Sequence, residues 1–322
     1  MSLLPRFRSC LRAGVLPVLA LATLAGCQKK AGDGKWVVGF AQMGHDNPWR
    51  MAQTASLKAE AQKRGYDIVV TDAQDQTAKQ VSDVEDLIAR GVNVILLAPR
   101  EYEGLSPALQ AAKDANIPVI LVDREAEGKA GEDYVTFLGS NFVDQGRRAA
   151  EWLVKETGGN AGIVELTGTP GASVAVDRSK GFHDVIAQHP GMKIIASQTG
   201  EFSRANGQRV MQNLAQSLGK QITAVYAHND EMALGALEAL RSAGLQPGRD
   251  VRVVSIDGER AALEAIQRGE LGATVESNPR FGPIAFETIE QVRHHQPVPP
   301  KKLITDRFFD RTNAAQFVAE AY

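Results

Sequence analysis

Cysteine is scarce in this sequence, with only Cys10 and Cys27 among 322 residues. Because both lie near the N-terminus, the rest of the chain can build neither a disulfide framework nor a thiolate metal site. Lysine and arginine form no basic block, and 36 of them stand against 38 acidic residues, so the electrostatic footprint of a nucleic-acid-binding protein is missing. The remaining composition, with 43% hydrophobic residues, is typical of a soluble globular protein of two domains.

The common catalytic and cofactor motifs are absent as well. No Gly-x-Gly-x-x-Gly follows an expected strand, and neither a Gly-x-x-x-x-Gly-Lys loop nor a Gly-x-Ser-x-Gly elbow occurs. The six histidines show no metal-binding spacing. His228 follows an expected strand, where a hydrogen-bonded side chain beside a pocket is a simpler interpretation than a general base. We therefore expect no enzymatic activity, no cofactor and no metal.

Residues 1–26 have the architecture of a secretory signal peptide. Three arginines precede an apolar stretch over residues 13–25, which is too short and too interrupted by Gly and Pro to span a bilayer as a stable helix. The stretch ends in Leu-Ala-Gly-Cys, which resembles the bacterial lipobox, whose cysteine is acylated and becomes the mature N-terminus. We therefore expect a lipid anchor on Cys27 and a polar tether over residues 27–35. The alternative is a chance cysteine in a signal peptide that is cut elsewhere.

Strand and helix patterns alternate from residue 36 to the end of the chain. Such alternation predicts an α/β fold with parallel sheets that helices cover on both faces. A break near Ser140 divides the pattern into two sets, which indicates two Rossmann-like lobes. The expected strands lie at residues 36–42, 66–71, 92–98, 117–122, 134–138, 162–166, 193–197, 222–227, 251–256, 272–276 and 303–308.

The last segment of the chain is too small to enclose a core of its own. Its strand, helix and strand must therefore complete sheets that have already begun. The chain would then cross between the lobes near Ser140, near Ser277 and near Lys302. The expected boundaries are 36–139 plus 278–302 for the N-terminal lobe and 140–277 plus 303–322 for the C-terminal lobe.

Four expected strands end in polar or charged side chains. The apolar run at residues 118–122 leads directly into Asp123 and Arg124, and open α/β sheets bind ligands beyond the carboxyl ends of their strands. Taken alone, this pair is equally consistent with a solvent-facing ion pair. Because three further strands end in the same way, we expect one polar pocket with an aromatic floor. The side chains expected there are Asp46, Trp49, Arg50, Asp123, Arg124, Asn229 and Asp257.

These residue types suit the recognition of a monosaccharide. Each sugar hydroxyl donates and accepts, so carboxylates and amides can accept from it while guanidinium groups donate in a fixed fork. An aromatic ring can cover the C–H face of the sugar. Arg178, near the start of a helix in the second set, is either a further guanidinium of the pocket or a surface cation. Phe202 is either an opposite wall of the pocket or a hydrophobic anchor of its loop.

Short motifs along the whole chain resemble the periplasmic sugar-binding proteins of the ribose-binding type, which have the type I periplasmic binding protein fold. The motifs are Asn-Pro-Trp at 47–49, residues 118–124, Asp-Arg-Ser-Lys-Gly at 177–181, Phe202 before Ser-Arg, residues 227–233 and Ile-Asp-Gly at 256–258. The resemblance implies two lobes joined by three hinge strands, an ABC permease as partner, and a monomer in the periplasm or on the outer face of the cytoplasmic membrane. It further implies that hydroxyls and the ring oxygen are bound by Asp123, Arg124, Arg178, Asn229 and Asp257, with the ring between Trp49 and Phe202.

Residues 44–50 and 171–178 resemble the galactofuranose-binding members of that family. Ribose binders carry a second aromatic residue where this chain has Arg50, and a glutamine near the position of Ser277. A guanidinium beside Asp46 suits a sugar with extra hydroxyls off the ring, so galactofuranose is the expected ligand. The alternative is that Arg50 and Asp46 only pair with each other at the rim, where an ion pair contributes little.

Other functions remain open. A receptor of the same fold could bind ribose or inositol and signal to a chemoreceptor or a sensor kinase. A repressor of the lactose type shares the fold, but it needs a helix-turn-helix where this chain has a signal peptide. An enzyme would need a positioned nucleophile and base, which the motifs do not supply.

Overall fold

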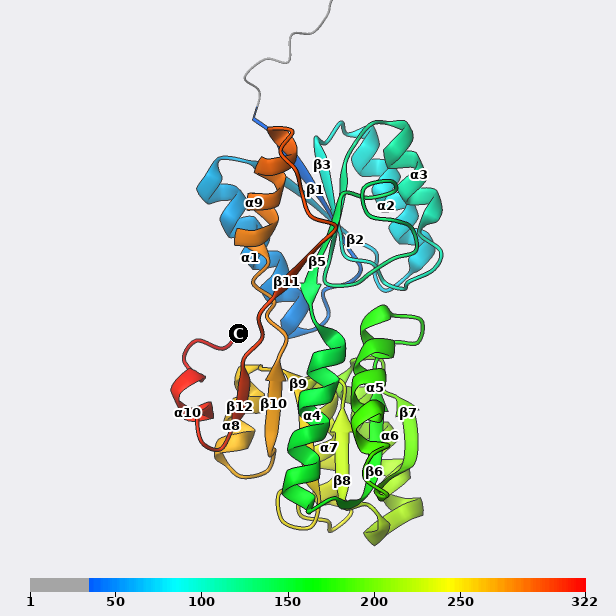
Figure 1. Ribbon diagram of the computed structural model, residues 1–322, viewed down its shortest axis with the longest axis vertical. Helices are drawn as coiled ribbons and strands as arrows, with labels where there is room; N and C mark the ends of the chain where they lie inside the picture. Colours follow the sequence, from blue (N-terminus) through cyan, green and yellow to red (C-terminus); the bar gives the residue numbers. More distant parts are fainter. Residues whose placement is uncertain (1–34) are drawn as a thin grey trace, which may run out of the picture. The chain divides into compact units, whose positions relative to one another are not determined.

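The computed structural model describes residues 35–322 as one compact unit. The predicted signal peptide, Cys27 and most of the predicted tether lie outside the described residues. Two six-stranded sheets organise the described unit, each with helices on both faces (Figure 1). In this part of the chain no helix is long and apolar enough to cross a membrane. The predicted α/β fold with two lobes is confirmed.

The first sheet has the strand order β11-β5-β4-β3-β1-β2, and every pairing within it is parallel. Its central strands are valine-, isoleucine- and leucine-rich and buried on both faces, as parallel strands between helix layers must be. The strands are β1 (Val37–Gln42), β2 (Asp67–Asp72), β3 (Val94–Leu97), β4 (Val119–Val122), β5 (Thr136–Ser140) and β11 (Lys301–Ile304). The helices of this lobe are α1 (Pro48–Arg64), α2 (Thr77–Ala89), α3 (Ser106–Asp114) and α9 (Gly282–Arg293).

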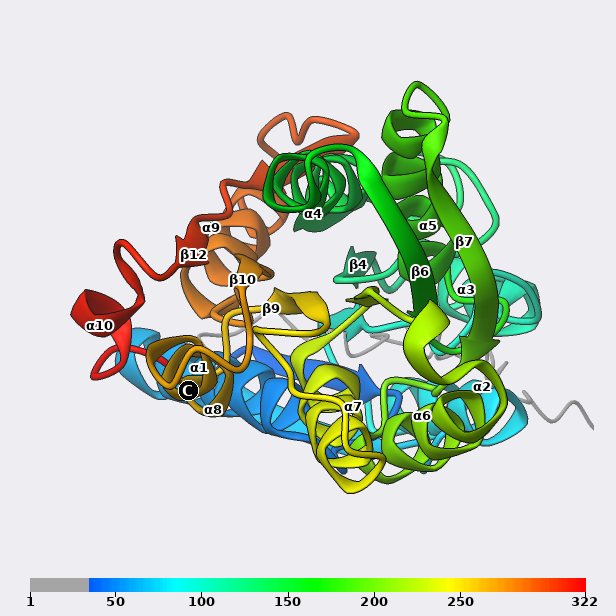
Figure 2. The same ribbon diagram turned by 90° about the horizontal axis from the view of Figure 1, so that it is seen from below.

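The second sheet has the order β12-β10-β9-β8-β6-β7, with only the β10–β12 pair antiparallel. Its strands are β6 (Asn160–Thr167), β7 (Gly191–Thr199), β8 (Ala224–Ala227), β9 (Arg252–Asp257), β10 (Ala273–Glu276) and β12 (Phe308–Asp310). The helices are α4 (Phe142–Thr157), α5 (Ser173–Ile186), α6 (Arg204–Leu218), α7 (Asp230–Ser242), α8 (Arg260–Gln267) and α10 (Ala314–Phe317), with a 3-10 turn at Gly219–Gln221. Figure 2 shows α4 and α5 on one face of this sheet and α6, α7 and α8 on the other.

Asparagine side chains cap the N-terminal turns of two helices, α1 and α7. Asn47 Oδ1 accepts from the backbone N–H of Arg50 at the start of α1, and Asn229 Oδ1 accepts from that of Met232 at the start of α7. Each bond satisfies an otherwise unpaired N–H of the first helical turn. Helix α1 ends at Gly65 in the left-handed conformation that glycine adopts without strain. The Asn47 and Asn229 side chains, which follow β1 and β8, are therefore held in place by the helices that they cap.

The chain passes between the two sheets three times, as predicted from the small size of its last segment. The crossovers follow β5 at Ser140, follow β10 at residues 277–281, and join β11 to β12 through residues 305–307. The prediction of a single strand at residues 303–308 is wrong. The segment consists of two short strands, because each of them completes a different sheet. Strand β11 ends at Ile304, two residues beyond the lobe boundary expected after Lys302.

Candidate functional site

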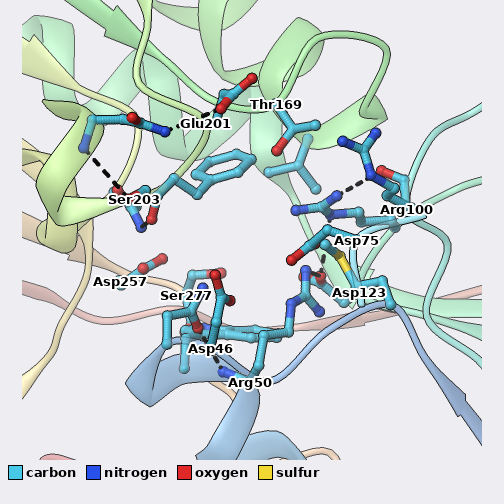
Figure 3. A pocket seen from close by; sticks show the side chains of 18 of the residues that line it. Asp46, Arg50, Asp75, Arg100, Asp123, Thr169, Glu201, Ser203, Asp257 and Ser277 are labelled. Carbon is cyan, nitrogen blue, oxygen red and sulfur yellow. Dashed lines mark hydrogen bonds and ion pairs between the residues drawn. The ribbon is translucent and has the colours of Figure 1, made fainter. Parts of the chain in front are cut away.

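A cavity of about 220 Å³ lies where the carboxyl ends of strands from both sheets meet. Figure 3 shows side chains of both lobes arranged around it. All nine side chains expected from the sequence line this one cavity, although their contact with a ligand stays a prediction. They are Asp46, Trp49, Arg50, Asp123, Arg124, Arg178, Phe202, Asn229 and Asp257.

Arg50 and Asp123 form a buried ion pair in the lining of the cavity. The Arg50 Nη2 to Asp123 Oδ2 distance is 2.6 Å, and each side chain is 6% exposed. Arg50 also donates to Gln53 Oε1 at 3.3 Å and lies over the Trp49 ring at 4.6 Å. The alternative of an Arg50–Asp46 pair at the rim is wrong, because Asp46 is exposed and Arg50 is buried against another carboxylate.

Arg124 is buried with part of its hydrogen-bonding capacity unused. Its Nη1 donates to the carbonyl oxygen of Arg100 at 2.7 Å, and its guanidinium carbon lies 5.3 Å from the centre of the Phe202 ring. Burial and the neighbouring Arg50 cation lower the pKa of Arg124 to about 9, so the group stays charged at neutral pH. Its Nε has no hydrogen-bond partner among residues 35–322. Since buried donors are nearly always paired, this one is suited to a ligand oxygen.

Arg178 is 3% exposed and is therefore no surface cation. It donates from Nε to Gln145 Oε1 at 3.0 Å and from Nη1 to the carbonyl oxygen of His228 at 2.6 Å. Its Nη2 lies 3.5 Å from Asp257 Oδ1. Two hydrogen bonds fix the plane of the guanidinium, so Arg178 presents its remaining N–H groups in one orientation.

Asp257 closes strand β9 with a backbone φ of 138°, a region that residues other than glycine rarely adopt. The carboxylate of Asp230 holds the following loop, accepting from the N–H of Gly258 at 2.7 Å and of Glu259 at 2.8 Å. Burial raises the pKa of Asp257 well above its usual range, and the Arg178 cation opposes that rise. The loop therefore aims a buried carboxyl group at the cavity.

Aromatic residues come to the cavity from opposite lobes. Trp49 on α1 donates from Nε1 to the carbonyl oxygen of Ser277 at 2.7 Å, which fixes its ring. Phe202 lines the cavity with a φ of 60°, and its carbonyl oxygen accepts from Asn229 Nδ2 at 3.1 Å. Phe202 lines the cavity and is also a buried member of the hydrophobic core, so both interpretations of this residue agree with the structure. Because Asn229 also caps α7, only one N–H and one lone pair of its amide remain for a ligand.

His228 is a buried support beside the cavity. Its Nε2 lies 3.1 Å from Glu165 Oε1, and its Nδ1 accepts from the N–H of Gly168 at 3.3 Å. Burial lowers the pKa of His228, which favours the neutral ring. Neither nitrogen is available to a ligand, so the hydrogen-bonded interpretation of this histidine agrees with the structure.

Sequence reasoning missed Asp75 and Arg100, which also line the cavity. Both follow strands of the first sheet, β2 and β3, so the rule that found Asp123 would have found them had it been applied to every strand. Asp75 has a left-handed φ of 57°, and a Cβ at Gly44 would lie 2.9 Å from its Oδ2. Burial and the nearby Asp46 charge raise the pKa of Asp75. Thr169, Glu201, Ser203 and Asn206 complete the polar lining from the second lobe.

The charges of the lining nearly cancel, which suits a neutral ligand. Within residues 35–322 no group of three or more His, Cys, Asp or Glu side chains is placed to hold a metal ion. The lining arginines are Arg50, Arg100, Arg124 and Arg178, and the lining acids are Asp46, Asp75, Asp123, Glu201 and Asp257.

The model of the periplasmic binding protein domain matches residues 38–293. The chain belongs to the periplasmic binding protein family. The family expected from the sequence motifs is thereby confirmed. This periplasmic binding protein is 42% identical over 271 residues to the galactofuranose-binding protein YtfQ of Escherichia coli (strain K12), an alignment that covers 83% of this chain and 85% of the relative. It is 37% identical over 265 residues to the ribose import binding protein RbsB of Bacillus subtilis (strain 168), covering 82% and 84% of the two chains.

Solved structures agree with these relatives. A crystal structure of a galactofuranose binding protein superimposes on this periplasmic binding protein with a TM-score of 0.86 at 38% identity, covering 88% of this chain and 98% of the other. The periplasmic component of an arabinose ABC transporter from Shewanella sp. ANA-3, bound to α- and β-L-arabinofuranose, gives a TM-score of 0.85 at 40% identity, covering 88% and 95%.

Proposed function

We propose that this protein is the extracytoplasmic receptor of an ABC sugar importer and binds a monosaccharide, galactofuranose, between its lobes. The cavity itself supports the proposal, because buried guanidinium and carboxyl groups of nearly balanced charge line it together with Trp49 and Phe202. Such a lining offers donors and acceptors in many directions to a neutral polyhydroxyl ligand. The volume of about 220 Å³ is below the 300–1,000 Å³ of sites for drug-sized ligands and suits one sugar ring.

Two features of the cavity lining favour galactofuranose over ribose. The Arg50–Asp123 pair places a charged group where a second aromatic would cover a compact pentose. Asp46, Asp75 and Arg100 extend the polar lining on the first lobe, where an exocyclic diol could be held. The relative that is 42% identical is named for galactofuranose, and an arabinose-binding neighbour holds a furanose. The similar proteins named above are binding proteins, which supports a protein that acts by binding.

Binding of a sugar by both lobes favours a closed arrangement. Only a ligand that interacts better with one arrangement can shift the population toward it. We place the hinges at the three crossovers, at Ser140, at residues 277–281 and at 305–307. Lipid anchoring through Cys27 and delivery of the sugar to a permease complete the proposal.

A titration of the purified protein with D-galactose, L-arabinose and D-ribose tests the function. Solutions of galactose contain some of the furanose form, so binding of that form draws on a minor species and gives a measurable apparent affinity. Arg124→Ala should weaken binding about tenfold or more, since it removes charged donors from a desolvated site. Arg90→Ala, which removes an arginine that is 58% exposed just after the end of α2, is the matched control and should bind as the wild type does. Absence of binding for all three sugars would refute the proposal.

A further inference from the structure

One carboxylate touches all three crossovers between the sheets. Asp306 lies in the third crossover, and its Oδ1 accepts from Ser140 Oγ of the first at 3.1 Å. The same oxygen accepts from the backbone N–H of Asn278, in the second crossover, at 3.3 Å. Any rotation of one lobe against the other must change the geometry at this side chain.

A buried glutamine connects this carboxylate to the sugar site. Gln145 on α4 is 1% exposed and does not line the cavity. Its Nε2 donates to Asp306 Oδ2 at 2.8 Å and lies 3.2 Å from the carbonyl oxygen of Glu276, while its Oε1 accepts from Arg178 Nε at 3.0 Å. A guanidinium can only donate and a carboxylate can only accept, so the amide has one possible orientation between them.

We propose that Gln145 is a positioning residue that couples the sugar-binding Arg178 to the three crossovers through Asp306. This inference rests on the proposed function, because it assigns the sugar contact to Arg178. A sugar hydroxyl that binds Arg178 contacts a guanidinium that the Gln145 amide already holds, and the same amide holds the Asp306 carboxylate at the hinge. Part of the binding free energy is thereby transmitted to the lobe arrangement, which is the physical content of coupling between distant sites.

The position of the Asp306 carboxylate depends on the hydrogen bonds that it accepts. The donors to this carboxylate are all neutral: the Ser140 hydroxyl, the Gln145 amide and the backbone N–H of Asn278. Burial and the Glu276 charge on β10 raise the pKa of Asp306 to about 6. The nearby cations are otherwise engaged, since Arg307 binds Glu276 at 2.8 Å and Arg148 on α4 donates to the backbone oxygen of Asp306 at 3.0 Å. Loss of the glutamine amide would thus leave Asp306 Oδ2 without its 2.8 Å donor.

The test is a double-mutant cycle on the affinity for D-galactose. Gln145→Leu removes the amide at similar volume. Asp306→Asn keeps an acceptor for Ser140 and Asn278 but sets an amide NH₂ opposite that of Gln145. Each single variant should weaken binding about tenfold, and the double variant should be no more than about twofold weaker than either, because both changes break the same connection. Arg148→Ala, which touches the same crossover outside the connection, should bind within about twofold of the wild type.

If Gln145 and Asp306 only stabilised the fold, the measurements on these variants would give a different result. The substitutions would lower the melting temperature of the sugar-free protein while leaving the affinity unchanged, or they would give losses that add in the double variant, and either result overturns the inference. If Gln145→Leu does not fold, Gln145→Asn, whose shorter amide cannot reach both partners, replaces it in the cycle. A wild type that binds no sugar removes the proposed function and the inference together. A wild type that binds, with single variants of equal affinity, overturns the inference alone.

Discussion

Asp123→Leu removes the carboxylate that balances two buried guanidinium groups. In the intact protein Asp123 Oδ2 lies 2.6 Å from Arg50 Nη2 and 3.8 Å from Arg124 Nε, and all three side chains are at most 6% exposed. The Arg50 charge already lowers the pKa of Arg124. Without Asp123, the Arg50 and Arg124 cations lie in a desolvated site and lose the carboxylate that is 2.6 Å from one and 3.8 Å from the other.

The expected cost follows from that geometry. Breaking a buried ion pair by deleting one partner destabilises a protein by about 3 to 5 kcal/mol, because an uncompensated charge stays buried. Sugar binding should weaken by a further 1.5 to 3 kcal/mol, roughly ten- to a hundredfold, for the lost acceptor and the displaced Arg124. The double variant Asp123→Leu with Arg50→Leu should recover much of the stability, since it removes both charges, but it should not recover the affinity.

Urea unfolding and calorimetric titration separate the two effects. The unfolding midpoint reports the buried charge, while the dissociation constant reports the sugar contact. A single variant as stable as the wild type would show that the Arg50–Asp123 pair is not buried as described. A double variant that is less stable than Asp123→Leu would contradict the charge argument. Unchanged affinity in both would remove Asp123 from the sugar site.

Three further predictions concern sugar choice, pH and the anchor. Arg50→Phe should narrow or reverse the preference for galactose over ribose in competition titrations. An unchanged ratio of the two affinities would show that Arg50 does not determine which sugar is bound. Burial raises the pKa of Asp306 to about 6, against about 3.9 in an unfolded chain. The native state therefore binds more protons between these values, so this carboxyl lowers stability as pH rises from about 4 to 6. Asp306→Asn should remove up to about 2 kcal/mol of that decline, allowing for the partial exposure of the residue, as urea midpoints across the range would report. Cys27→Ser should release the protein from the membrane fraction of expressing cells, and equal membrane association of variant and wild type would count against the anchor.

Strand ends explain why most of the site could be predicted from the sequence. Asp123 follows a wholly apolar strand, and the position of such a residue at the edge of a parallel sheet is fixed by the strand itself. The same rule reaches Asn229 and Asp257. Asp75 and Arg100 lie three residues beyond the ends of β2 and β3, so the rule reaches them less directly than it reaches Asp123.

Contacts between remote segments could not be predicted. Gln145 and Asp306 are 161 residues apart, and nothing in the local pattern of α4 indicates that this glutamine faces a crossover. The division of residues 303–308 into two strands has the same origin, because local propensity cannot tell which sheet a short strand completes. The partner of Arg50 is a third case, since the sequence does not show that Arg50 is buried beside Asp123 while Asp46 is exposed.

The ring form of the bound sugar shows whether the cavity is a galactofuranose site. Galactose labelled with ¹³C at the anomeric carbon can be added to the wild-type protein, and the spectrum of the bound sugar distinguishes the furanose from the pyranose ring. The proposed site predicts a bound signal from the furanose, enriched far above its share in free solution and displaced by unlabelled galactose. It also predicts that Arg124→Ala weakens this signal while Arg90→Ala keeps it. A bound pyranose, or no bound galactose at saturating concentration, would show that this cavity is not a galactofuranose site.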